Sequence, residues 1–243
     1  MAMDRTHPDA RSRLVEAALR LIAEHGPSEI KARSVSSEAG LSTMGVYTYF
    51  GGVPELLQAV ADEGFERQAA IFRQVANTDD PMADLCAMAL ACRDFAKRNP
   101  HLYDLMFGLS IQGRYSPART TSASEPRERS ASFQASYAHL LGECKRMVET
   151  KLVDEIDPDH MAAQLWSALH GFIMLELGGY FAAVADPAFE VLIPMCVNLI
   201  VGLGADRKTA ESSAVPAGIA ASRAGSSAPE AAVRSRRKAR HRG

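Results

Sequence analysis

The chain has 243 residues, of which 47% are hydrophobic, and a formal net charge of -2 at pH 7. This predicts a soluble globular protein with a sizeable core, built as one large or two small domains. The N-terminal residues MAMDRTHPDA lack the apolar run of a secretory signal, and the four cysteines form no CxxC pair. A cytoplasmic protein without structural zinc is therefore expected.

The first part of the chain is divided into short helices by Gly and Pro. Apolar residues recur every three or four positions in residues 11–25, and Gly26-Pro27 then ends the pattern. Gly40 is suited to stop a second helix, and Ser42 to cap the third. The helices expected here cover residues 11–25, 32–39, 43–50 and 54–71.

The remaining helices are more apolar, and most of them are longer. They are expected at residues 82–98, 101–108, 133–148, 158–184 and 187–203, with a mobile polar loop at 110–130 and a kink at Pro194. Neither alternating strand patterns nor internal repeats are visible, so the predicted class is all-α, with about nine helices.

Residues 161–185 form an apolar stretch that is long enough to cross a bilayer. Gln164, His170, Glu176 and the Gly178-Gly179 pair interrupt it, and ionisable groups at bilayer depth are costly. We therefore expect no membrane span, but a helix buried between other helices or in an oligomer interface.

Basic charge is concentrated in the last 40 residues. Nine Lys or Arg stand against three Asp or Glu in residues 204–243, which are otherwise rich in Ala, Ser, Gly and Pro. Such a segment buries too little apolar surface to offset its ordering entropy, so it is predicted to be a disordered tail. It either attracts DNA without sequence preference or is a solvated charge run.

The stretch AGLSTMGVYTYF, residues 39–50, has the features of a helix-turn-helix motif. At 100° per residue, Val46 and Phe50 face the first helix, while Met44, Gly45 and Thr48 lie roughly opposite. Tyr47 and Tyr49 project to the two flanks, where phenolic hydroxyls reach phosphates on either side of a groove. The alternative is an ordinary helical hairpin with half-buried tyrosines.

Residues 11–60 closely resemble the N-terminal domain of the TetR family of bacterial transcription regulators. The resemblance is carried by RLVEAALRLIAEHG, KARSVSSEAGLSTMGVYTYF and PELLQAV. It implies a homodimer on a roughly palindromic operator, with a three-helix DNA-binding domain at 1–55 and a ligand-binding and dimerisation domain at 56–203. The DNA-binding residues implied by the motif are Arg33, Ser34, Ser42, Thr43, Met44, Gly45, Tyr47, Thr48 and Tyr49.

Two features depart from that pattern. Val53 stands where the family usually carries a lysine, which removes one expected phosphate contact per subunit. Residues 1–50 hold six basic and six acidic residues, rather than the basic excess of a DNA-binding domain.

LWSALHGFIMLE, residues 165–176, resembles the Trp-His-Gly signature of one TetR subgroup. Trp166 and His170 share a helix face, as a pocket wall or as structural core near the dimer interface, and Gly171 permits close approach of another helix. The candidate ligand-binding residues, each with core packing as the alternative, are Phe95, Tyr103, Met106, Phe107, Phe133, Tyr137, Trp166, His170 and Met174.

No catalytic motif or metal-ligand cluster is present in the sequence, so we predict no enzyme activity and no cofactor. The expected function is that of a DNA-binding transcriptional regulator, a repressor released by a small, largely apolar ligand. The alternative is a helical ligand-carrier or protein-interaction module that has lost DNA binding.

Overall fold

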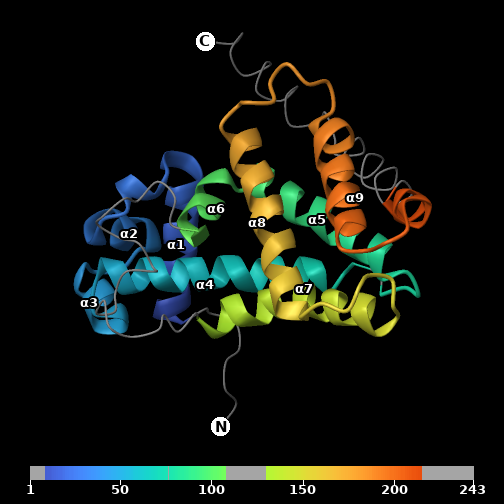
Figure 1. Cartoon of the computed structure of the whole chain (residues 1–243). Helices are drawn as coiled ribbons and strands as arrows, with labels where there is room; N and C mark the ends of the chain where they lie inside the picture. The colour runs from blue at the N-terminus through green and yellow to red at the C-terminus, as the bar shows by residue number, and fades with distance from the viewer. Residues whose placement is uncertain (1–8, 76, 108–129, 215–243) are drawn as a thin grey trace, which may run out of the picture.

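The computed structural model describes residues 9–75, 77–107 and 130–214, and within these ranges all regular structure is helical. This confirms the predicted all-α class. Helices α1, α2 and α3 gather at one end, and α4 leads from them into the larger domain (Figure 1). The helices are α1 (Ala10–His25), α2 (Ala32–Ala39), α3 (Met44–Phe50), α4 (Val53–Phe72), α5 (Pro81–Arg98), α6 (Pro100–Phe107), α7 (Ala131–Glu149), α8 (Pro158–Leu177) and α9 (Ile193–Gly202).

The first three helices form a small domain around one face of α1. The Asp9 carboxylate accepts a hydrogen bond from the Ser12 amide at 2.7 Å and so caps α1, which then buries Leu14 and Ile22 completely. Gly40 ends α2 in the left-handed conformation, with φ of 64°, as the sequence predicted. A short turn then leads directly into α3.

Helix α4 belongs to both domains. Its first turns bury Leu56, Leu57 and Val60 in the same core as α1 and α3, whereas its second half packs along α6 and α7. At the α4–α6 crossing, a Cβ on Gly64 would lie 2.7 Å from Met106 Sδ, so glycine is what allows this close contact. The boundary predicted between residues 55 and 56 falls in the first turn of this continuous helix.

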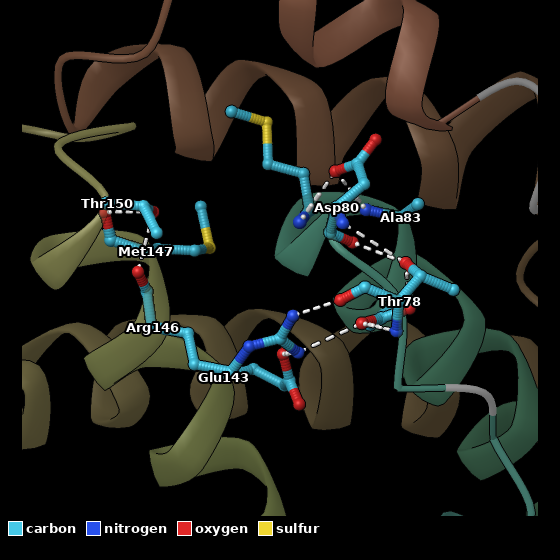
Figure 2. A network of polar contacts seen from close by, with 9 residues as sticks. Thr78, Asp80, Ala83, Glu143, Arg146, Met147 and Thr150 are labelled. Atoms are coloured by element: carbon cyan, nitrogen blue, oxygen red, sulfur yellow. Dashed lines mark hydrogen bonds and ion pairs between the residues drawn. The ribbon is translucent and has the colours of Figure 1, made fainter.

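Helix α7 is tied to the segment before α5 by a network around Arg146 (Figure 2). Arg146 Nη1 donates to the buried Asp84 carboxylate at 2.9 Å and to Glu143 at 2.6 Å, and its Nη2 donates to the Thr78 carbonyl. The Thr78 amide and hydroxyl also donate to Asp84, each at 2.8 Å. This network of hydrogen-bonded charges thus connects α7 to the start of α5 and to the segment before it.

The end of α8 and the interior of the last helical run differ from the sequence expectation. Helix α8 stops at Leu177 and not near residue 184, because Gly178 follows and Gly179 takes a φ of 79°. A π-helical turn, Ala188–Leu192, precedes α9, and Pro194 then lies in the first turn of that helix. Residues 187–202 thus form one unbroken helical run, close to the predicted 187–203, and the irregularity near Pro194 is a π-helical turn within it.

The prediction that disorder begins at residue 204 is wrong for residues 204–214. Gly204 forms a turn with φ of 101°, and the Asp206 carboxylate accepts from the Thr209 amide at 2.9 Å to cap a helix over 207–214. Ala205, Ala210 and Ala214 are buried in the core of the larger domain. The rest of the predicted tail, 215–243, and most of the predicted loop at 110–130 lie outside the described residues.

No helix in the described parts of the chain is both long and apolar enough to cross a membrane. The same ranges hold no group of three or more His, Cys, Asp or Glu side chains arranged to bind a metal ion.

Candidate nucleic-acid interface and ligand pocket

The outer face of α3 is uncovered. Met44 is 68% exposed, Tyr47 53% and Tyr49 48%, whereas Val46 is fully buried, so the helix is oriented as the sequence predicted. Ser42, Thr43 and Thr48 are also exposed. The outward residues thus form a polar and aromatic ridge at the end of the molecule remote from α9 (Figure 1).

Two residues of this motif differ from their expected roles. Thr43 occupies the N-cap position of α3 and makes no side-chain capping hydrogen bond, while the Ser42 carbonyl accepts from the Gly45 amide at 2.9 Å and so begins the first turn one residue earlier. Gly45 is partly buried, and a Cβ there would lie 3.8 Å from Leu14 Cδ1. That is ordinary van der Waals contact, so alanine fits at position 45 without disturbing the domain.

The start of α2 carries the other two residues expected at DNA. Arg33 is exposed, and no ion pair or hydrogen bond holds its guanidinium within the described residues. The Ser34 hydroxyl accepts from the Lys31 amide at 3.1 Å and donates to backbone carbonyls of Glu29 and Lys31. Because its only proton serves the start of α2, Ser34 positions this helix and has none left for a phosphate.

Most cations near α3 are engaged inside the domain. Arg13 donates to the Ala39 carbonyl at 2.6 Å, Arg20 pairs with Glu38 at 2.8 Å, and Arg11 lies 5.0 Å over the Phe50 ring. Val53 packs against the same core. Contacts to a phosphate backbone would therefore fall mainly to Arg33 and to the tyrosine hydroxyls of α3.

A largely apolar cavity of about 60 Å³ lies between α4, α5, α7, α8 and α9, with Phe107 at the end of α6 also in its wall. Five of the predicted ligand residues line it, namely Phe107, Phe133, Tyr137, Trp166 and His170. Their rings touch one another: the Trp166 and His170 centroids are 4.7 Å apart, and those of Phe107 and His170 are 4.3 Å apart. The Trp-His pair is thus part of the pocket wall.

Four predicted ligand residues do not reach this cavity. Phe95, Tyr103 and Met106 are buried in the core, and Met174 packs against that core one turn beyond His170 on α8. Helical spacing fixes which residues share a face, but it does not fix which turn of the helix meets the cavity.

The pocket also holds polar residues that were not among those predicted to bind a ligand. Ser136 Oγ donates to Gln68 Oε1 at 2.9 Å, and Gln68 Nε2 donates to Cys92 Sγ at 3.4 Å. The Cys92 thiol lies near the phenol of Tyr103, and that phenol is hydrogen-bonded to Nδ1 of His170. We call this series of five residues, one each from α7, α4, α5, α6 and α8, the buried polar chain.

A sequence signal for two of these residues exists. Gln68 lies three residues after Phe65, and Ser136 three residues after Phe133, at positions where the helical repeat calls for an apolar side chain. A polar residue on an otherwise apolar helix face indicates a buried hydrogen bond or a site.

Burial keeps the polar chain uncharged at neutral pH. It lowers the pKa of His170 to about 3, raises the pKa of Cys92 to about 12, and raises the pKa of Tyr103 far above its ordinary value. The pocket cysteines Cys86 and Cys196 likewise have their pKa raised by burial, to about 12 and about 11. These thiols are therefore protonated and poorly nucleophilic.

Comparison with known proteins agrees with this architecture. Residues 14–60 match the family model of bacterial regulatory proteins of the tetR family, and residues 85–195 match that of the tetracyclin repressor-like C-terminal domain. The HTH-type transcriptional regulator Rv1816 of Mycobacterium tuberculosis is 24% identical, over 72% of this chain and 85% of its own.

Solved structures share the fold. A protein of unknown function from Rhodococcus sp. RHA1 superposes with a TM-score of 0.66 at 21% identity, covering 83% of this chain and 99% of that one. RolR in complex with resorcinol superposes with a TM-score of 0.58 at 19% identity, covering 84% of this chain and 92% of RolR.

The two family models match separate parts of the chain, the helix-turn-helix domain and the larger helical domain. Both describe regulators and neither describes an enzyme. The chain is a DNA-binding transcriptional regulator and belongs to the TetR family.

Proposed function

We propose that the protein is a repressor that binds a roughly palindromic operator as a homodimer and leaves it when a small, largely apolar ligand fills the pocket. The carrying observation is the exposure of α3. Of the five large hydrophobic side chains that are exposed in the described residues, Met44, Tyr47 and Tyr49 lie on this short helix. Side chains of this kind, uncovered together on one helix, indicate a partner surface.

The roles of the DNA-binding residues follow from their positions on α3. Thr43 and Met44 project from the first turn and would read base edges, whereas Gly45 lies against Leu14 of its own domain. Tyr47 and Tyr49 would donate hydrogen bonds to phosphates on the two flanks. Ser42, Thr48 and Arg33 are exposed at the margin of the same surface and would add backbone contacts.

The proposed dimer would form on the outer faces of α8 and α9. On α8, Ala163, Ser167 and Gly171 are exposed at four-residue spacing, and Leu175, one turn further on, is 45% exposed. A Cβ on Gly171 would meet nothing within 4 Å. Small side chains in a row allow close approach of a second helix, so a matching subunit would bury Leu175. Such a dimer would hold the two α3 helices about 34 to 36 Å apart, one turn of DNA.

Release by a ligand is supported by the size and place of the cavity. Its volume of about 60 Å³ is smaller than the roughly 150 Å³ that accommodates benzene in a dry protein cavity. A ligand must therefore displace pocket walls, and α4 carries Phe65 and Gln68 in that wall as well as Leu56 in the DNA-binding core. RolR, which shares the fold, binds resorcinol. We also propose that Trp166, His170 and Gly171 mark the Trp-His-Gly subgroup.

The repressor proposal is tested by salt-dependent binding of the purified full chain to its own upstream DNA, against random DNA of equal length. We expect tighter binding to the upstream DNA, with the affinity falling as salt rises. Equal affinity for both would favour the alternative, a helical ligand-carrier or interaction module that has lost DNA binding. Val53 and the internally paired cations of the first domain support that alternative. A regulator of this kind would act in the cytoplasm.

A further inference from the structure

We propose that the effector is a neutral, largely apolar molecule that presents one hydroxyl or carbonyl group to Gln68 and Ser136. This inference rests on the proposed effector pocket and names the chemistry that the pocket would accept. It arises from the buried polar chain, four of whose five members line the cavity.

Gln68 has hydrogen-bonding capacity that the protein leaves unused. A primary amide offers two N–H donors and two acceptor positions. The structure engages one donor, with the Cys92 thiol at 3.4 Å, and one acceptor position, with the Ser136 hydroxyl at 2.9 Å. A thiol is a weak acceptor. If the amide is rotated by 180°, the same count applies, so the conclusion does not depend on which terminal atom is nitrogen.

Ser136 is in a similar position. Its hydroxyl proton goes to Gln68, and within the described residues no hydrogen bond uses its oxygen lone pairs. Both side chains are buried, Gln68 at 4% exposure and Ser136 at 3%. A ligand hydroxyl could accept from the Gln68 amide and donate to Ser136 Oγ, and a carbonyl could do the first. Either group would form hydrogen bonds at buried donor or acceptor positions that water cannot easily reach.

The rest of the wall argues against charge on the ligand. No Lys, Arg, Asp or Glu is found among the side chains around the cavity in the described part of the chain. His170 is neutral there, because burial lowers its pKa to about 3. A carboxylate or an ammonium group would therefore enter without a counter-ion, which is strongly unfavourable in an apolar site.

The remaining surface suits a compact apolar body. Phe107, Phe133 and Trp166 present rings, and Met88 and Met195 present flexible thioether chains that can adapt to a bound molecule. The proposed ligand thus places its polar group at α4 and α7 and its apolar part against α6 and α8.

The test uses the full chain and three probes of similar size, namely benzene, phenol and benzoate. Trp166 is the only tryptophan and lines the pocket, so its fluorescence reports binding directly. We expect phenol to bind about fivefold more tightly than benzene, the worth of one hydrogen bond, and benzoate not to bind. In Gln68→Leu, the ratio of the affinity for phenol to the affinity for benzene should fall to about one, while benzene is still bound.

Two further variants complete the design. Ser136→Ala should reduce the ratio and provides a second test if Gln68→Leu does not fold. Gln58→Leu, on the same helix but outside the pocket, should keep the full ratio.

Three outcomes would overturn this inference without affecting the proposed effector pocket. The unmodified chain could bind phenol and benzene equally, or bind benzoate more tightly than phenol. The ratio of phenol to benzene affinity could also be unchanged in both pocket variants. If neither benzene nor phenol binds, the pocket proposal fails together with this inference. The DNA measurement above is independent of both.

Discussion

The phenol of Tyr103 is hydrogen-bonded to Nδ1 of His170, and the two rings stack with centroids 5.6 Å apart and planes inclined by 17°. Tyr103 is fully buried on α6, a helix that also packs against α1 of the DNA-binding domain. His170 lines the ligand pocket on α8. This pair therefore joins the pocket wall to a helix that contacts the DNA-binding domain.

Stability should depend on pH through His170. Its pKa is about 3 in the folded protein and about 6.5 in the unfolded chain, so the unfolded chain binds one more proton between these values. The contribution of this histidine to the free energy of unfolding is therefore complete above pH 6.5 and is lost as pH falls towards 3. Between pH 6.5 and pH 3, the free energy of unfolding should fall by about 1.4 kcal/mol for each unit by which the pH is lowered.

The measurement compares denaturant unfolding of the unmodified chain and of His170→Gln, which removes the titration, from pH 7 to pH 4. The difference between the two free energies should narrow as pH falls. His160→Gln is the control, because His160 lies exposed at the start of α8. A pH-independent difference for His170→Gln would contradict the assigned shift.

Operator binding should weaken when the hydroxyl of Tyr47 is removed. Tyr47→Phe would remove the phosphate hydrogen bond that we propose for each subunit, and we expect a loss of about 1 kcal/mol per subunit without unfolding. Tyr180→Phe provides the matched control, since Tyr180 is 77% exposed in the larger domain. Unchanged affinity for Tyr47→Phe, measured by fluorescence anisotropy, would remove Tyr47 from the DNA contacts.

Replacing Arg146 should destabilise the larger domain. Arg146→Gln leaves the buried Asp84 carboxylate without its cation, which should lower the free energy of unfolding by about 2 kcal/mol, less than for a fully buried pair because Arg146 is partly exposed. Arg98→Gln breaks only an exposed pair with Asp94 and should cost less than about 0.5 kcal/mol. Equal effects of the two variants in urea unfolding would show that the network contributes little.

The elements that the sequence predicted best are those with local signals. Helix α2 has the predicted bounds, and α1 begins one residue early, because Asp9, Gly26 and Gly40 cap or stop these helices. The apolar pattern of α8 continues past Gly178 and so predicts a helix longer than the one observed, which ends where the backbone turns at Gly179.

What could not be predicted depends on contacts between distant segments. Tyr103 and Phe107 are both aromatic residues of α6, four residues apart, yet only Phe107 lines the cavity. The rotation of each helix relative to its neighbours decides this, and no local pattern records it. The helix at 207–214 was missed for the same reason, since its alanines are buried only by the surface of the larger domain.

That helix gives a prediction of its own. Ala210 is 2% exposed, so Ala210→Glu places a charge in the core and should destabilise the protein by about 2 kcal/mol or more. Lys208→Glu, at an exposed position of the same helix, should change stability by less than about 0.5 kcal/mol. If thermal unfolding shows the same small effect for both, residues 207–214 do not pack as the structure describes.

Met44 should determine which operator sequence is preferred. Its side chain is 68% exposed on the first turn of α3 and contributes nothing to the buried core, so Met44→Ala should leave the melting temperature unchanged. Loss of an apolar contact to a base edge, such as a thymine methyl group, should relax the preference at one position of each half-site. Selection of bound sequences from random DNA measures this directly. Tyr47→Phe is the contrasting variant, because losing a phosphate contact weakens all sequences alike. If Met44→Ala also lowers affinity uniformly, with the preferred sequence unchanged, then Met44 faces the DNA backbone and another residue of α3 reads the bases.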